Sequence, residues 1–238
     1  LFPYTTLFRS GQSVRLVADG ARRAFVSGPL QLREGVTVVI DSGVILFASR
    51  DPRAYDVTPG ACGILSTAGR GCRPLFMAER AHHSGIMGGG IIDGRGWSRI
   101  GGTGATWWEL AEQARDTKFS QNNPRLIQAL RTNDFTLYRL TLRNSPNFHV
   151  VFDRGDGFTA WGVRINTPKG ARNSDGIDPE RLQRPATLRA LRQRTQALGG
   201  ELKVDTRPGG GTRLELTVPL ERKRKRAVKA PDFAVSGG

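Results

Sequence analysis

The sequence has only two cysteines, and it contains no long hydrophobic run. No stretch approaches the roughly 18 consecutive apolar residues that a membrane-spanning helix needs, so we expect no membrane association through such a span. Cys62 and Cys72 have no second Cys or His pair at a spacing typical of zinc sites. The two cysteines either close a loop as a disulfide or remain as partly buried thiols.

Histidine is equally scarce, with three residues in 238. His82 and His83 have no cysteine or carboxylate at metal-binding spacing, which favours loop residues over metal ligands. There is also no phosphate-binding loop of the Gly-x-x-x-x-Gly-Lys type. We therefore expect neither a metal nor a cofactor.

What the sequence does contain is 38% hydrophobic residues, 30 glycines and many Asn, Asp and Thr residues. This composition favours a core of short strands joined by many turns over a helical bundle. The net charge of +15 is unevenly distributed. There are 22 Lys and Arg against 15 Asp and Glu up to Pro179, and 14 against 6 from Glu180 onward. This shift predicts a boundary between two parts of the chain near 179–180.

The first ten residues, LFPYTTLFRS, have neither the basic start nor the apolar stretch of a signal peptide. All ten match the in-frame translation of a common short-read sequencing adapter. We interpret residues 1–10 as an artefact of sequence assembly, so the printed sequence carries no recognisable export signal.

Between residues 11 and 179, short apolar runs alternate with Gly, Asn and Pro. The clearest runs, each expected to be a strand, are 36–40, 44–48, 126–130, 148–152 and 161–165. FTLYRLTLRNSP, from Phe135, is repeated as FTAWGVRINTP from Phe158, a period of 23 residues (158 − 135). Such a period indicates stacked units, each one rung of a solenoid of short strands. A β-sandwich has similar strands but needs no repeat, so the pattern favours a right-handed β-helix.

Four blocks with their order and spacing resemble the polygalacturonase family of glycoside hydrolases. They are GGGIIDGRGWS (88–98), NNPRLIQ (122–128), NSPNFHVVF (144–152) and NTPKGARNSDGIDP (166–179). The resemblance covers about 11–179 and implies an all-β, single-stranded right-handed parallel β-helix of the pectin lyase-like type, here incomplete. It also implies inverting hydrolysis of α-1,4-linked galacturonan in pectin by a protein that is secreted or periplasmic. We expect the soluble chain to be a monomer. Its partner is an anionic polysaccharide.

The resemblance assigns roles to residues of the last block. Asn173-Ser174-Asp175-Gly176 stands where the family has Asn-Thr-Asp-Gly, so Asp175 corresponds to a carboxylate that helps activate water. Asn173 and Asp178 are expected to orient the site. Without the flanking blocks, Asp175 and Asp178 would be ordinary turn residues.

Three further residues are candidates for substrate binding. His149 faces either the substrate groove or the interior as a structural histidine. Lys169 and Arg172 are candidates to pair with galacturonate carboxylates, and the alternative for both is solvent-facing charge.

The family pattern breaks off after Pro179. The adjacent Asp pair, the Gly-His-Gly histidine and the Arg-Ile-Lys segment of the family are all missing from the remaining sequence. Because an inverting hydrolase needs an acid and a base acting together, we expect negligible glycosidase activity from the chain as printed. A non-catalytic β-helix that binds pectin or oligogalacturonate is the alternative function.

Residues 180–220 have a different character and predict a short α+β tail. Helical spacing from Leu188 to Leu198 ends at Gly199-Gly200, and two strands follow around a Pro-Gly-Gly-Gly turn. The segment 187–220 resembles the C-terminal end of the ATP-binding domain of sensor histidine kinases. That family's Asn-bearing helix and Asp-x-Gly-x-Gly motif are absent, so we expect no ATP binding. Residues 221–238 begin with the basic run ERKRKR, which favours a solvated, disordered end over nucleic-acid binding.

Overall fold

The computed structural model describes residues 10–172, 174–180, 195–197, 199–207 and 211–217. The chain forms two compact units, residues 1–182 and residues 183–238. The predictions made for residues 1–9, for Asn173 and for the basic run 221–226 lie outside the described residues. No described helix is long and apolar enough to cross a membrane.

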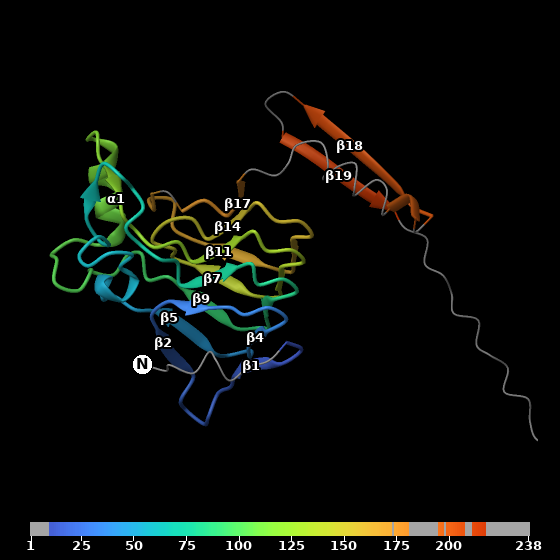
Figure 1. The fold of residues 1–238 in the computed structure, drawn as a ribbon, viewed down its shortest axis with the longest axis horizontal. Helices are drawn as coiled ribbons and strands as arrows, with labels where there is room; N and C mark the ends of the chain where they lie inside the picture. Colours follow the sequence, from blue (N-terminus) through green and yellow to red (C-terminus); the bar gives the residue numbers. More distant parts are fainter. Residues whose placement is uncertain (1–9, 173, 181–194, 198, 208–210, 218–238) are drawn as a thin grey trace, which may run out of the picture. The chain divides into compact units, whose positions relative to one another are not determined.

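The first unit is built from three parallel sheets (Figure 1). The first sheet contains β1 (Ser13–Leu16), β4 (Thr37–Ile40), β8 (Gly85–Met87), β12 (Thr136–Tyr138) and β15 (Thr159–Trp161). The second contains β2 (Ala24–Ser27), β5 (Ile45–Ala48), β9 (Ile91–Asp93), β13 (Thr141–Arg143) and β16 (Arg164–Asn166). The third contains β3 (Leu30–Gln31), β7 (Phe76–Glu79), β11 (Ile127–Leu130), β14 (Val150–Asp153) and β17 (Ile177–Glu180).

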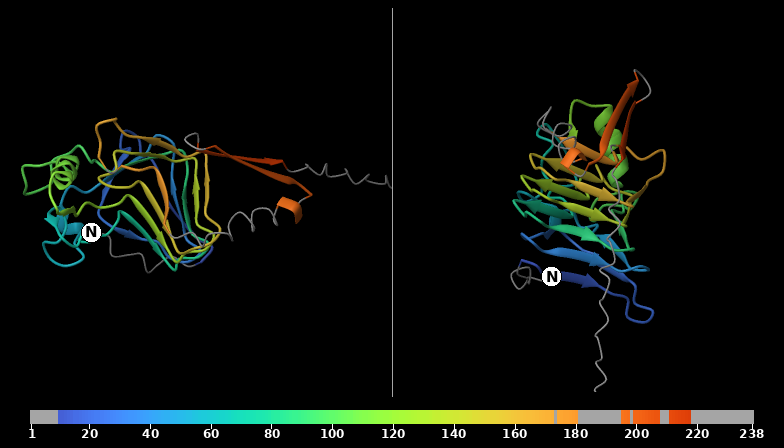
Figure 2. Two further views of the ribbon diagram at one scale, coloured as in Figure 1. Left: turned by 90° about the horizontal axis from the view of Figure 1, so that it is seen from above. Right: turned by 90° about the vertical axis from the view of Figure 1, so that its right-hand side faces the viewer.

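The chain visits these sheets in a fixed order, first, second, third, and then begins again. Each passage is one rung, and each strand pairs in parallel with the strands of the rungs above and below it. Figure 2 shows the strands stacked in this way from two further directions. This is the parallel β-helix that the sequence predicts.

The 23-residue repeat corresponds to the step from the fourth rung to the fifth. Thr136 is in register with Thr159, and Thr141 with Arg164. The rings of Phe135 and Phe158 stack at 6.3 Å with an angle of 11° between their planes. The single strand expected over 161–165 is wrong, because Gly162, with φ of +64°, turns the chain between β15 and β16.

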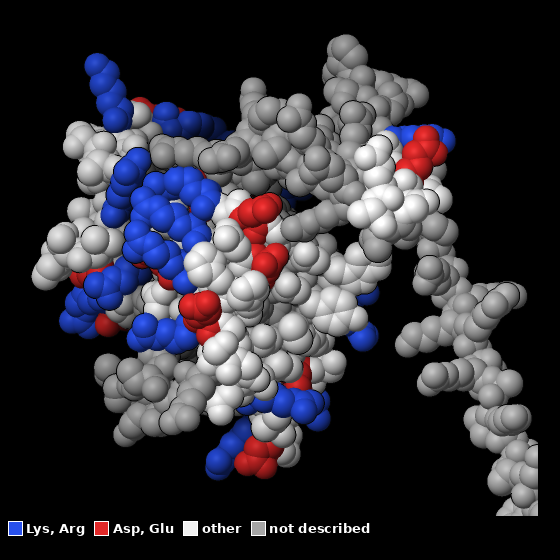
Figure 3. All heavy atoms as spheres, turned by 45° about the vertical axis from the view of Figure 1, so that its right-hand side comes forward, with Lys and Arg blue, Asp and Glu red and all other residues white. Residues whose placement is uncertain are grey.

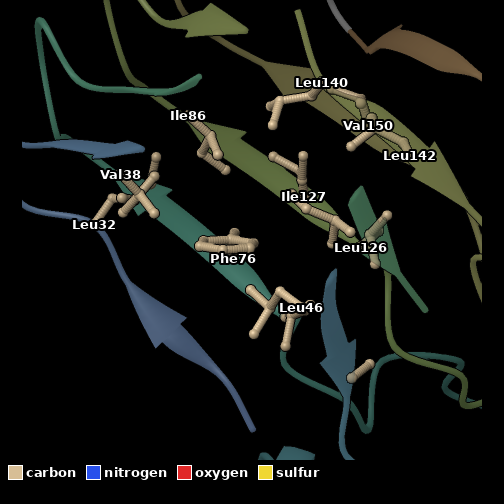
Figure 4. Packing of buried hydrophobic residues seen from close by; sticks show 14 of the residues in the cluster. Leu32, Val38, Leu46, Phe76, Ile86, Leu126, Ile127, Leu140, Leu142 and Val150 are labelled. Atoms are coloured by element: carbon tan, nitrogen blue, oxygen red, sulfur yellow. The ribbon is translucent and has the colours of Figure 1, made fainter. Parts of the chain in front are cut away.

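The core consists of apolar ladders that run through successive rungs. Side chains alternate between the two faces of each strand, so every second residue points inward. In the third sheet Phe76, Ile127 and Val150 lie in register, and all three are fully buried. The first and second sheets contribute the ladders Val38–Ile86–Leu137 and Leu46–Ile92–Leu142. Figure 4 shows labelled members of all three ladders, among them Phe76, Ile86 and Leu46, between the sheets.

The long loops all occur at one place in the rung, the turn that leads from the second sheet to the third. In the second rung this turn spans 49–75 and contains the 3-10 helix η2 (Pro52–Tyr55) and β6 (Leu65–Ser66). In the third rung it spans 94–126 and contains α1 (Trp107–Arg115) and β10 (Ser120–Gln121). β6 and β10 pair antiparallel, which joins the two loops. We call this side of the β-helix the loop edge.

Local signals explain the elements of the loop edge. α1 begins with a capping box, in which Thr106 and Glu109 each accept a hydrogen bond from the other's backbone N–H. Cys62 and Cys72 form a disulfide, with their Cα atoms 4.8 Å apart. The sequence left open whether these cysteines form a disulfide or remain as thiols, and the structure shows the disulfide.

The second unit contains an antiparallel hairpin of β18 (Glu201–Arg207) and β19 (Gly211–Thr217). Glu201 pairs with Thr217 and Arg207 with Gly211, so the pairing extends over both strands. This confirms the two strands predicted for the tail. Of the expected helix, Thr195–Ala197 is described as helical, and Gly199 follows with φ of +68°. The resemblance to a histidine kinase domain stays a prediction.

Candidate active site

The four motif blocks converge on the loop edge. Block 88–98 contains β9 and the start of the long third-rung loop, and block 122–128 contains the end of that loop and β11. Blocks 144–152 and 166–179 are the corresponding turns of the fourth and fifth rungs, with β14 and β17. Segments up to 91 residues apart by position (88 to 179) therefore contribute to one edge.

Asp175 lies in the fifth-rung turn, two residues before β17, and it is exposed. Its backbone is attached to the fourth rung, because the His149 N–H donates to the Asp175 carbonyl at 2.9 Å. The Val150 N–H donates to the Gly176 carbonyl at 3.0 Å. The carboxylate thus stands at the start of a strand whose backbone is fixed on one side. Asn173, its predicted neighbour, lies outside the described residues.

Asp178 lies within β17, in register with Val151 of β14, which is itself in register with Gln128 of β11. These positions alternate with the inward ladder of Phe76, Ile127 and Val150, so they belong to the outer face of the third sheet. Asp178 is half-buried. Its orienting role stays a prediction.

His149 is fully buried beneath the fifth-rung turn. Its Nδ1 lies 3.1 Å from the Ser174 carbonyl oxygen and 3.0 Å from that of Asp175. Since both neighbours only accept, Nδ1 carries the proton, and Nε2 accepts from the Thr167 hydroxyl at 2.9 Å. Burial lowers the pKa of His149, which keeps the imidazole neutral. The structure therefore favours the structural alternative, a histidine that holds the Asp175 turn, over direct contact with substrate.

Lys169 and Arg172 are exposed residues of the same turn. The Arg172 guanidinium forms an ion pair with Glu112 of α1, which ties the fifth-rung turn to the long loop of the third rung. Lys169 has no ion pair within the part of the chain that the structure describes. Binding of galacturonate by either residue stays a prediction.

A second carboxylate of the motif blocks, Asp93, is a structural anchor. It is 2% exposed and ends β9. It accepts from Arg143 Nε at 2.9 Å and from Asn144 Nδ2 at 3.1 Å, both on the next rung, and from the Arg95 N–H at 2.9 Å. A carboxylate paired and buried in this way holds two turns together and is unavailable to a substrate.

The loop edge contains a groove of about 450 Å³ over the outer face of the third sheet. Among its lining residues are Arg70, Asn123, Arg125, Asn147, Asp153 and Arg154. We call this the outer groove. No sequence pattern predicts any of these six as a site residue, although Asn123, Arg125 and Asn147 lie in the motif blocks.

The disulfide loop forms one wall of the outer groove through Arg70 and Cys72. Asn122 holds this wall in place, because its Nδ2 donates to the Ala61 carbonyl and to Ser66 Oγ, each at 2.9 Å. Its Oδ1 accepts from the Gly71 N–H at 3.2 Å. Asn122 therefore fixes a loop more than fifty residues earlier in the chain.

Asn123 and Asn147 attach the groove to α1 and to the fourth rung. Asn123 Nδ2 donates to the Trp107 carbonyl at 2.7 Å and to the Pro146 carbonyl at 3.2 Å. Asn147 Nδ2 donates to the Asn123 carbonyl at 3.2 Å. Trp107 is fully buried beside Tyr55, so it belongs to the core.

A parallel β-helix with polar loops and a carboxylate motif gathered along one sheet is the architecture expected of β-helical glycoside hydrolases. The profile of the family described as Glycosyl hydrolases family 28 matches residues 28–184. The chain belongs to this family.

The proteins to which this chain is similar are named as polygalacturonases. The chain is 48% identical over 169 residues to an endo-polygalacturonase of Pectobacterium carotovorum subsp. carotovorum, covering 71% of this chain and 42% of the relative. It is 44% identical over 190 residues to a polygalacturonase of Ralstonia nicotianae, covering 75% and 36%. The solved polygalacturonase from Erwinia carotovora ssp. carotovora superposes with a TM-score of 0.71 and 46% identity, over 73% of this chain and 46% of that one. The chain thus spans less than half the length of these relatives.

Proposed function

We propose that this chain forms the N-terminal part of the substrate groove of an inverting polygalacturonase, which hydrolyses α-1,4-linked galacturonan in pectin. The observation that supports it best is the place of Asp175. It stands at the start of β17, on the edge where all four family blocks meet, and its turn is held by His149. In this proposal Asp175 helps to activate the attacking water. A secreted or periplasmic location suits such a polymer substrate.

The chemistry needs a second group across the scissile bond. An inverting hydrolase places an acid and a base about 6.5–9.5 Å apart, with room for water between the base and the sugar. The family's Asp pair, which supplies the acid, has no counterpart after Pro179 in the printed sequence. We therefore propose that the 238-residue chain binds galacturonan but hydrolyses it at a negligible rate. Arg70, Arg125 and Arg154 along the outer groove favour the binding alternative, because guanidinium groups pair with carboxylates.

The experiment is a reducing-end assay on polygalacturonate with the purified 238-residue chain. We expect release at the level of the buffer blank, while an active family member included as a positive control gives a strong signal. Release well above the blank, abolished by Asp175→Asn, would show that the chain carries a complete acid–base pair and that the proposed inactivity is wrong.

A further inference from the structure

We propose that a second pocket, beside the second sheet, is an accessory site that binds a carboxylate of the galacturonan chain outside the outer groove, with Arg50 and Arg95 as its cations. The pocket has a volume of about 680 Å³, and we call it the Arg95 pocket. The inference rests on the proposed function, because it takes the class of its ligand from there. It adds a place on this chain where the polymer is held without being positioned for cleavage.

The Arg95 pocket shares no lining residue with the outer groove. It is formed by the beginnings of the two long loops, at 49–53 and at 95 and 101–102, together with Val26 of β2. The ends of the same loops, within 69–72 and at 122–123, line the outer groove. The two pockets are therefore separate surfaces, and a sugar residue in one does not occupy the other.

Arg95 is held in place at both ends of its side chain. Its backbone has φ of +55°, and its N–H donates to Asp93 Oδ1 at 2.9 Å. The guanidinium carbon lies 5.7 Å from the centroid of the Phe47 ring, on the outer face of the second sheet. Among the described residues, the guanidinium donates only to the Ala48 carbonyl, at 3.5 Å. Most of its five N–H donors thus remain for a ligand.

Arg50 brings a second positive charge close to Arg95. Burial and, after it, the charge of Arg50 lower the pKa of Arg95. Arg50 is exposed and forms no ion pair within the part of the chain that the structure describes. Its carbonyl accepts from the Gly101 N–H at 2.8 Å, which ties its backbone to the third-rung loop. Two like charges held near each other repel, and an anion bound between them relieves this repulsion.

The carboxylates nearest to the two cations are already paired. Asp51 lines the pocket and accepts from Arg53 Nε and Nη2, each at 3.0 Å. Asp93, behind Arg95, is buried and pairs with Arg143 at 2.9 Å. The residues that line the pocket include three arginines against one aspartate, which leaves two positive charges for a ligand.

The ligand that suits the pocket combines a carboxylate with an apolar face. Paired guanidinium groups recognise a carboxylate. Val26, whose side chain is 66% exposed, and Pro52 supply apolar surface beside the two cations. A uronate residue offers both a carboxylate and a face of C–H groups, whereas inorganic phosphate offers charge alone. Lys and Arg side chains gather in groups on the surface, as the face viewed in Figure 3 shows, so a long polyanion can contact this chain at more than one place.

Amide exchange followed by mass spectrometry, with and without trigalacturonate, tests this assignment on the 238-residue chain. We expect the ligand to slow exchange in segments 49–54 and 99–102. In Arg50→Gln this protection is expected to need about tenfold more ligand, because a charge-assisted hydrogen bond is lost. The charge-matched control is Arg33→Gln, which changes an exposed arginine in the turn between β3 and β4, away from the loop edge. It is expected to behave like wild type.

The outcomes separate this inference from the proposed function. Protection of 49–54 that is equal in Arg50→Gln and wild type overturns the accessory site. Equal protection by fully methyl-esterified trigalacturonate, or by inorganic phosphate at the same concentration, also overturns it, because a uronate carboxylate is then not what the pocket recognises. Melting temperatures of both variants control for folding.

Segment 122–128, at the outer groove, reports on the proposed function in the same experiment. Protection there without protection of 49–54 overturns the accessory site and leaves the proposed function standing. Protection of 49–54 alone supports the accessory site and contradicts the proposed substrate groove. Protection of neither segment contradicts both proposals.

Discussion

Replacing Phe76 with alanine is expected to lower the free energy of unfolding by about 3–5 kcal/mol. Phe76 is fully buried in the third sheet, where Leu30 and Ile127 flank it in register. Removing its ring leaves a cavity between rungs that the paired backbones prevent from collapsing. Since a domain of ordinary stability unfolds with about 5–15 kcal/mol, the loss is a large part of the total. The measurement is the denaturant midpoint of the variant against wild type.

Met77→Ala is the matched control, because Met77 is the next residue of β7 and points to the outer face. It is half-buried, so we expect a cost of about 1 kcal/mol or less. Equal losses in the two variants would contradict the assignment of Phe76 to the inside of the rung.

Replacing His149 with alanine is expected to cost about 2–4 kcal/mol. The Ser174 carbonyl loses its imidazole donor, and an unsatisfied group costs about 1–3 kcal/mol where it is buried. The Asp175 carbonyl keeps the backbone N–H of residue 149, and removing the fully buried ring adds the cost of a cavity. The effect is local to the Asp175 turn, so the amides of residues 149 and 150 should exchange faster with solvent. Amide exchange followed by mass spectrometry measures this, with β2 and β5 as internal references.

His149→Asn serves as the conservative variant, because the asparagine amide places a donor near the position of Nδ1. It is expected to restore most of the protection at the turn. Protection that is lost equally in both variants would show that the imidazole acts by filling space and does not act by donating to the two carbonyls.

The unfolding free energies of the wild type and of His149→Asn should also depend differently on pH. Burial lowers the pKa of His149 in the folded state, so folding favours the neutral ring. The stability that this gives is present above the unfolded pKa of about 6.5, and it is lost as the pH falls through the lower folded value. The difference in unfolding free energy between wild type and His149→Asn should therefore shrink below about pH 6.5. A difference that stays constant between about pH 8 and pH 5 would contradict a neutral, donating imidazole.

The sequence predicts the β-helix from one repeat, and the structure shows why only one is visible. The fourth and fifth rungs have short turns at the loop edge, so Phe135 and Phe158 recur after one rung without interruption. In the second and third rungs, the segments 49–75 and 94–126 separate strands that are neighbours in space. Insertions at one corner conceal the period without disturbing the stack.

Residues of the candidate site could be predicted from the sequence only where they belong to a recognisable motif. Asp175 is a candidate through the Asn-Ser-Asp-Gly motif, and its catalytic role stays a prediction. The structural role of His149 depends on Thr167 and Ser174, which contact it from the next rung. Arg70 carries no motif at all. It joins the outer groove because Asn122 holds the disulfide loop across some fifty residues of sequence. Contacts between rungs of unequal length have no fixed spacing in the sequence.

The most direct test of a galacturonan groove in this chain is a calorimetric titration of the wild-type protein with hexagalacturonate, set beside a neutral galactose oligomer of the same length. The account predicts saturable binding of the uronate oligomer, weakened by added salt because charged groups carry it, and no comparable binding of the neutral one. Absence of binding, or equal affinity for both oligomers, would contradict the account.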